Sequence, residues 1–215
     1  MRKVSFVLVA VLLFLMIAGC GSNDGGKPIE TSPAERTFST VSEFLEVYKR
    51  EDVSGLSSGF NGFAADLNKA VHLISMDDLS SGGWEKTFDL DMDEYIMEMY
   101  SLETVLFGKP ATVSSMLNRY DASILNASLD VVIDTGKDVD DISLATGVCE
   151  KMFSKYGDAF YIYVSGEETS ESELRKVWEA GVDFNCMWVI DADGENIGFS
   201  VGISDGGILV SCSFE

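Results

Sequence analysis

Three acidic residues in the middle of the chain are the first candidates for chemistry. Asp89, Asp91 and Asp93 alternate with apolar residues, which is the opening spacing of an EF-hand calcium loop. The rest of that pattern is missing, because Glu94 stands where the loop needs glycine and Tyr100 where it needs a bidentate glutamate. We therefore interpret the run as the acidic start of a helix, where carboxylates are favoured by the helix dipole.

Two loops in the second half of the chain resemble ligand-binding loops only in part. The run from Asp191 to Glu195 could hold a weak calcium ion, but an ordinary hairpin turn explains it as well. Gly136 and Lys137 follow an expected strand, yet a Walker A loop needs a second glycine and a hydroxyl residue where Val131 and Asp138 stand. We assign no metal, cofactor or phosphate site to either loop.

The residues needed for most hydrolytic chemistry are scarce. His72 is the only histidine and falls away from the apolar stripe of its expected helix, so we expect it at the surface. A single histidine cannot form a two-histidine metal site, and nothing else in the sequence supports a Ser-His-Asp triad that includes it. A glycosidase that uses two carboxylates remains open, since its acids can be far apart in sequence.

Glu103 is the one acid on the apolar face of an expected helix. A carboxylate in that position should have a raised pKa or a basic partner, for which Lys109 and Arg119 are the candidates. Structural pairing is the simpler interpretation, and a role in a pocket is the alternative.

The first twenty residues carry a targeting signal. Arg2 and Lys3 precede an apolar run from Val4 to Ala18, which is shorter than the roughly 20 residues of a membrane-spanning helix. The run Ile17-Ala18-Gly19-Cys20 resembles the lipobox of bacterial lipoproteins. This resemblance implies that residues 1–20 are a lipoprotein signal peptide, that Cys20 is modified with diacylglyceryl, and that the chain is cut just before it. Residues 21–38, rich in Gly, Ser and Pro, then form a flexible tether to the membrane.

Charge and composition limit the partners of the remaining chain. Loss of Arg2 and Lys3 reduces 15 basic residues to 13 against 36 acidic ones, which leaves a net charge of −23. Such a chain repels nucleic-acid phosphates, so we exclude nucleic acid as a partner. A hydrophobic content of 46% still indicates a packed core, and we expect a single domain over residues 39–215.

The apolar periodicity predicts an α+β fold, with a helical half over residues 39–121 and a sheet half over 128–215. The expected helices span 40–52, 60–74, 91–106 and 110–120, with a loop at 55–59 and a break at 80–83. A βαβ unit follows, made of strands 129–133 and 160–164 around a helix that Asp138 caps, and a helix capped by Ser170 comes next. Three alternating runs, 184–190, 197–203 and 208–214, predict an antiparallel meander, so the mixed sheet should have about five strands.

The meander carries two further features. Cys186 and Cys212 lie on its outer strands, two strand spacings apart, so we expect both thiols to be reduced, and Cys149 is left without an assigned state. The face opposite its apolar residues is small and polar, suiting either solvent exposure or close approach by a ligand, and the last strand could be a free edge. That face consists of Gly198, Ser200, Gly202, Ser204, Ser211 and Ser213.

Taken together, these features predict a lipoprotein anchored through Cys20 on the extracytoplasmic side of the cell membrane. It should bind a protein partner in the envelope, or a cationic or polar ligand, without catalysis. The alternative is a carboxylate-dependent hydrolase of envelope glycans.

Overall fold

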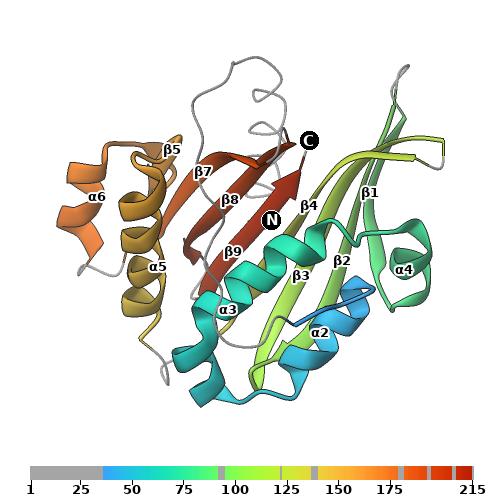
Figure 1. Cartoon of the computed structure of the whole chain (residues 1–215), viewed down its shortest axis with the longest axis horizontal. Helices are drawn as coiled ribbons and strands as arrows, with labels where there is room; N and C mark the ends of the chain where they lie inside the picture. The colour runs from blue at the N-terminus through green and yellow to red at the C-terminus, as the bar shows by residue number, and fades with distance from the viewer. Residues whose placement is uncertain are drawn as a thin grey trace.

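The computed structural model describes residues 36–91, 95–121, 123–136, 140–178, 182–192, 195–204 and 207–214. They form one antiparallel sheet of nine strands, with helices along one of its faces (Figure 1). The predicted mixed sheet of about five strands is therefore wrong. Cys20 and the tether up to residue 35 lie outside the described residues.

The sheet has the strand order β1-β2-β3-β4-β9-β8-β7-β5-β6, and every neighbouring pair is antiparallel. The strands are β1 (Glu85–Asp91), β2 (Ile96–Leu106), β3 (Lys109–Tyr120), β4 (Ser123–Ile133), β5 (Tyr161–Val164), β6 (Glu167–Glu168), β7 (Phe184–Ala192), β8 (Glu195–Ser204) and β9 (Gly207–Phe214).

The described helices begin at polar residues whose side chains accept a hydrogen bond from a backbone N–H of the first turn. They are α2 (Val41–Lys49), α3 (Val53–Val71), α4 (Met76–Ser81), α5 (Asp141–Tyr156) and α6 (Glu171–Val177), capped by Thr40, Asp52, Ser75, Asp140 and Ser170 respectively. The caps at Thr40 and Ser170 are as predicted. The predicted loop at 55–59 instead belongs to α3, and the cap of α5 is Asp140, whereas Asp138 lies outside the described residues.

The two helices predicted over 91–106 and 110–120 are strands β2 and β3. They are joined by a tight turn at Phe107 and Gly108, whose φ angles of 54° and 70° are both positive, as a two-residue hairpin requires. The backbone N–H of Phe107 donates to the carbonyl oxygen of Tyr48 at 2.9 Å, and the Phe107 ring packs on Tyr48 and Phe63. The glycine read as a helix stop therefore closes a β-hairpin.

The strand–helix–strand order of the predicted βαβ unit is present along the chain, but its two strands are not neighbours in the sheet. Strands β4 and β5 flank α5, but three strands, β9, β8 and β7, lie between them in the sheet. The meander of β7, β8 and β9 is confirmed, and it fills this gap. Strand β9 is consequently not a free edge, since it pairs with β4 as well as with β8.

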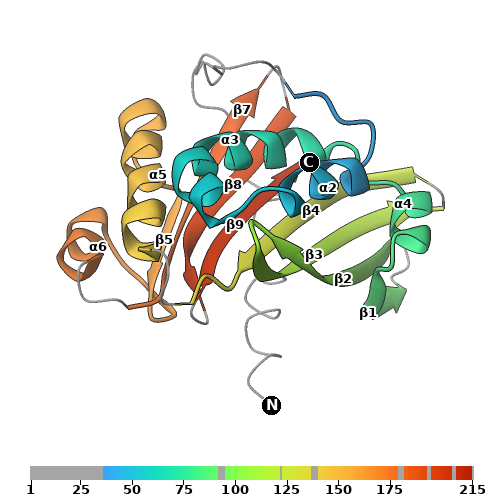
Figure 2. The same cartoon turned by 90° about the horizontal axis from the view of Figure 1, so that it is seen from below.

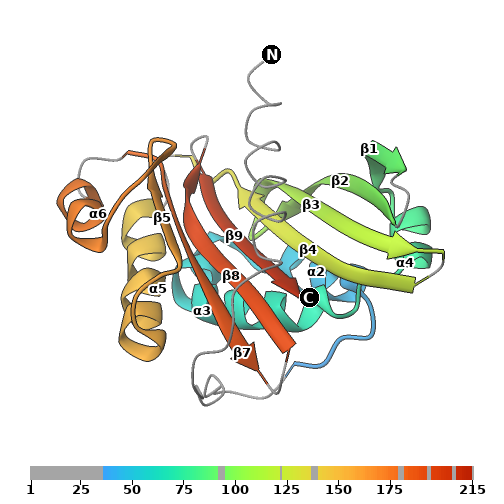
Figure 3. The same cartoon turned by 90° about the horizontal axis from the view of Figure 1, so that it is seen from above.

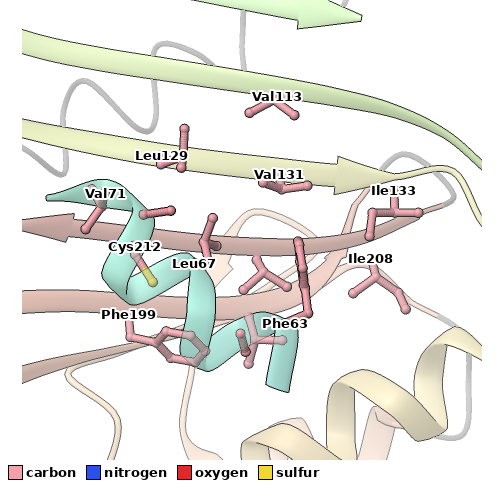
Figure 4. Packing of buried hydrophobic residues seen from close by; sticks show 14 of the residues in the cluster. Phe63, Leu67, Val71, Val113, Leu129, Val131, Ile133, Phe199, Ile208 and Cys212 are labelled. Carbon is pink, nitrogen blue, oxygen red and sulfur yellow. The ribbon is translucent and has the colours of Figure 1, made fainter. Parts of the chain in front are cut away.

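The main core lies between the sheet and the helices α2, α3 and α5, which Figures 2 and 3 show on the same side of the sheet. Helix α3 lays Phe63, Leu67 and Val71 across the two central strands, above Leu129 of β4 and Cys212 of β9 (Figure 4). All five side chains are fully buried, which at about 25 cal/mol per Å² makes this contact a main source of stability.

None of the described helices combines the length and the apolar composition that a membrane-spanning helix needs.

Candidate functional site

The small polar face of the meander lies where the sequence predicts, on the side of the sheet away from the helices. Ser200 pairs with Ser211 and Gly198 with Ser213, while the apolar partners in between face the core. Glycine is required at position 202 for a steric reason, because a Cβ there would overlap the carbonyl oxygen of Phe184 on the adjacent strand. Small residues here let the strands approach closely, so they do not by themselves indicate a ligand.

Asp130 extends this polar face onto β4. It pairs with Ser211 and accepts a hydrogen bond from the Ser128 hydroxyl at 3.2 Å. Burial raises the pKa of Asp130, and hydrogen bonds from Ser211 and Ser128 oppose that rise. Asp130 is not among the residues predicted from the sequence, although the alternation of β4 places its side chain on the other face of the strand from the buried Leu129 and Val131.

The prediction for Glu103 is wrong. The residue lies on a strand, its side chain is exposed, and its oxygens accept hydrogen bonds from the Thr112 hydroxyl at 3.1 Å. Neither of the proposed basic partners is involved in that bond. One of them, Arg119, binds a different acid.

The buried acid of β2 is Glu98, whose side chain is only 1% exposed. Arg119 Nε donates to its Oε2 at 2.7 Å, and Lys86 Nζ donates to its Oε1 at 2.5 Å. These hydrogen bonds, that of Arg119 above all, lower the pKa of Glu98 to about 2 in spite of its burial. Lys86 also binds Asp89 at 3.0 Å, so the four groups form a charge-balanced cluster on β1, β2 and β3. A permanently ionised, fully paired carboxylate is a structural group and not an acid–base catalyst.

The remaining candidates do not gather into a metal or catalytic centre. His72 is exposed, as predicted, and stacks on Phe214 with ring centroids 5.0 Å apart. Among the described residues no group of three or more His, Cys, Asp or Glu could hold a metal ion. Asp93, Asp193 and Lys137, on which the loop interpretations depended, lie outside the described residues.

The three cysteines beyond residue 20 are free and buried. The prediction that Cys186 and Cys212 are unpaired is confirmed, since β8 separates their strands. Cys149 of α5 meets Cys186, and this contact, together with burial, raises the pKa of the Cys149 thiol. Burial also raises the pKa of the Cys212 thiol, and thiols of raised pKa are poor nucleophiles, so neither Cys149 nor Cys212 is a candidate for covalent catalysis.

One hollow of the described surface lies between α6 and strands β5 and β6, at the end of the sheet away from β1. Its volume is about 530 Å³, within the usual range for small-molecule sites. It is lined by Asp158, Ala159, Phe160, Ile162, Glu168, Thr169, Ser170, Glu171, Ser172 and Arg175. No sequence pattern indicates this site, because its residues come from a loop, a two-residue strand and the start of a helix.

Arg175 organises one wall of the hollow. Its guanidinium binds both carboxylate oxygens of Glu150, and its Nε donates to Glu171 at 2.6 Å. It also lies over the rings of Phe153 and Trp178, at 5.5 and 4.9 Å from their centroids. The hydrogen bonds from Arg175 lower the pKa of Glu150. Four neighbours therefore hold this cation, and its two carboxylate partners more than offset its single positive charge.

The rest of the lining includes acidic and aromatic side chains. Asp158 and Glu168 are among the lining residues, and so is Phe160, which is 49% exposed although it is a large apolar residue. With Arg175 already neutralised, these two acids leave the hollow negative. Comparison with known proteins adds no assignment, since no family model, curated protein or solved structure matches the chain.

Proposed function

We propose that this protein is a lipid-anchored binding protein on the extracytoplasmic side of the membrane, held by a diacylglyceryl group on Cys20. We further propose that the hollow beside α6 takes a small ligand that carries a positive charge and polar groups. The observation that carries the proposal is the composition of this hollow: two carboxylates outside the Arg175 network, next to an exposed phenylalanine ring.

The chemistry of the lining selects for cations. Asp158 and Glu168 attract an ammonium group, and the face of Phe160 favours a cation over an anion through its quadrupole. Thr169 and Ser170 supply hydroxyl groups that can orient the rest of a polar molecule. An anionic ligand would meet uncompensated carboxylates, because Arg175 has no free charge to offer it.

The anchor and the charge of the chain act together. Two acyl chains give stable membrane attachment, whereas a single chain binds only reversibly. A mature net charge of −23 keeps the domain away from anionic headgroups while it concentrates cations around itself. Such an arrangement suits a receptor that captures a cationic solute close to the membrane.

The hydrolase alternative has one observation in its favour, because three carboxylates line a single hollow. A glycosidase needs one of its acids protonated, which requires a raised pKa. Burial raises the pKa of Asp130 and of Asp141, and both residues lie outside the hollow. The carboxylate of Glu171 is hydrogen-bonded to Arg175 and is not free to act on a substrate. Binding is therefore the better-supported function.

Calorimetric titration of the full chain with spermidine tests the binding proposal. Glu168→Gln should weaken binding by about tenfold, since one charge contact of ~1.4 kcal/mol is removed. Glu167→Gln is the matched control, because Glu167 is the neighbouring residue of the same strand and does not line the hollow. Equal affinity for both variants, or no heat of binding to the unaltered chain, would contradict the proposal. Release of reducing ends from envelope glycan, lost in Asp158→Asn, would support the hydrolase instead.

A further inference from the structure

Strand β1 forms one edge of the nine-stranded sheet and is exposed along its whole length. It pairs on one side with β2, and no strand among the described residues pairs with its other side. All seven of its residues, from Glu85 to Asp91, are exposed. The opposite edge is different, because β6 has only two residues. The sheet thus offers one edge that is long enough to accept another strand (Figure 3).

The two faces of β1 have opposite chemistry. Phe88 and Leu90 are 41% and 42% exposed and point to the face away from the helices. There Phe88 continues a row with Met99, its partner on β2, and Leu90 pairs with Met97 in the next row. A buried methionine cluster on β2 and β3 lies behind them. A strand added beyond β1 would place apolar side chains next to Phe88 and Leu90 and extend these rows.

The other face of β1 is charged. Asp89 and Asp91 lie on it, since they pair with Glu98 and Ile96 of β2, whereas Glu85 pairs with Ser101 and adds a further acid at the start of the apolar face. The one cation of the strand, Lys86, is already bound to Glu98 and Asp89. An added strand therefore meets net negative charge, so basic residues fit opposite the acids and acidic residues do not.

We propose that the free edge of β1 is the docking site for an extended segment of a partner protein, in which apolar and basic residues alternate. Main-chain hydrogen bonds along the edge supply affinity, and the alternation supplies specificity. Charge also disfavours the other simple occupant, a second copy of this chain, because both copies carry the same strongly negative net charge. The site is independent of the hollow beside α6, which lies at the far end of the sheet (Figure 1).

The probe for this proposal is a seven-residue peptide of alternating valine and lysine, titrated into the full chain in detergent. We expect saturable binding, with amide exchange slowed at residues 85–91. A peptide of alternating valine and glutamate, and the lysine peptide with a central proline, should each bind at least tenfold more weakly.

Charge reversal at the two edges of the sheet provides the decisive comparison. Glu85→Lys with Asp91→Lys should weaken peptide binding at least tenfold. Glu167→Lys with Glu168→Lys, the same change at the opposite edge, should leave binding within twofold. An equal loss in both double variants, or a loss only in the second, would overturn the proposal, as would a chain that dimerises through β1 in sedimentation experiments.

Discussion

Replacing Glu98 by glutamine removes the negative charge at the centre of the β1–β2–β3 cluster and keeps the shape of the side chain. The ordinary pKa of a glutamate is 4.5, and that of Glu98 is about 2 in the folded protein. At about 1.4 kcal/mol per unit this shift corresponds to at most ~3.5 kcal/mol of stability. Lys86 and Arg119 are 40% and 22% exposed, so solvent screens part of the attraction. We expect Glu98→Gln to lower the free energy of unfolding by about 2 kcal/mol at neutral pH.

The loss of unfolding free energy in Glu98→Gln depends on pH. Because the pKa of Glu98 is lower in the folded state than in the unfolded state, its contribution is complete above the ordinary value of 4.5. It decreases as pH falls below 4.5 and vanishes below about pH 2, where the carboxyl group becomes protonated in both states. The difference between the unaltered chain and Glu98→Gln should therefore shrink between these two pH values.

Urea unfolding, followed by tryptophan fluorescence at about pH 7, 5, 4 and 3, measures this difference. Glu103→Gln is the matched control, because Glu103 lies on the same strand but is exposed and bonded only to the Thr112 hydroxyl in the described structure. It should cost less than about 0.5 kcal/mol. An unfolding free energy that is equal for Glu98→Gln and the unaltered chain, or a difference that does not change with pH, would refute the electrostatic argument.

Three further outcomes follow from the packing of the sheet and its helices. Gly202→Ala should destabilise the protein by at least ~2 kcal/mol in urea unfolding, since the added Cβ would overlap the backbone of β7. Gly62→Ala, on an open face of α3, should instead stabilise the protein by up to about 1 kcal/mol. Leu67→Ala should cost about 2–5 kcal/mol by the same measurement, because its side chain is fully buried under the centre of the sheet; a smaller loss would mean that α3 packs loosely. Cys149 and Cys212 should react with Ellman's reagent only after unfolding, because both are buried and their pKa values are raised, and rapid labelling of the native protein would contradict the structure.

Helices whose ends carry a strong local signal could be predicted from the sequence. Thr40 and Ser170 cap α2 and α6 where the capping pattern places them. The meander could be predicted as well, because β7, β8 and β9 alternate between core residues and the small polar face. In each case the local pattern and the tertiary environment agree.

Strands β2 and β3 could not be predicted in this way, because β2 is buried on both faces along part of its length. Met97, Glu98, Met99 and Tyr100 are four consecutive buried residues, so the polar and apolar alternation that reveals a half-exposed strand is absent. The apolar residues that remain at intervals of three and four, from Ile96 to Leu106, imitate a helical stripe.

This error in secondary structure also explains the misplaced site residues. On a helix Glu103 would face the core and Glu98 would not, whereas on a strand Glu98 is buried and Glu103 is exposed. The hollow beside α6 could not be found at all, since the chain turns that bring Asp158 and Glu168 together carry no motif. Asp130 can be predicted only when β4 is known to be a strand, because the alternation of its residues then places Asp130 on the face away from the core.

The central proposal is that a lipid at Cys20 anchors the acidic domain and its hollow on the extracytoplasmic side of the membrane. Mass spectrometry of the protein purified from membranes tests this directly. We predict an N-terminal peptide that begins at Cys20 and carries the added mass of a diacylglyceryl group. A peptide that begins at Met1, or an unmodified Cys20, would contradict it.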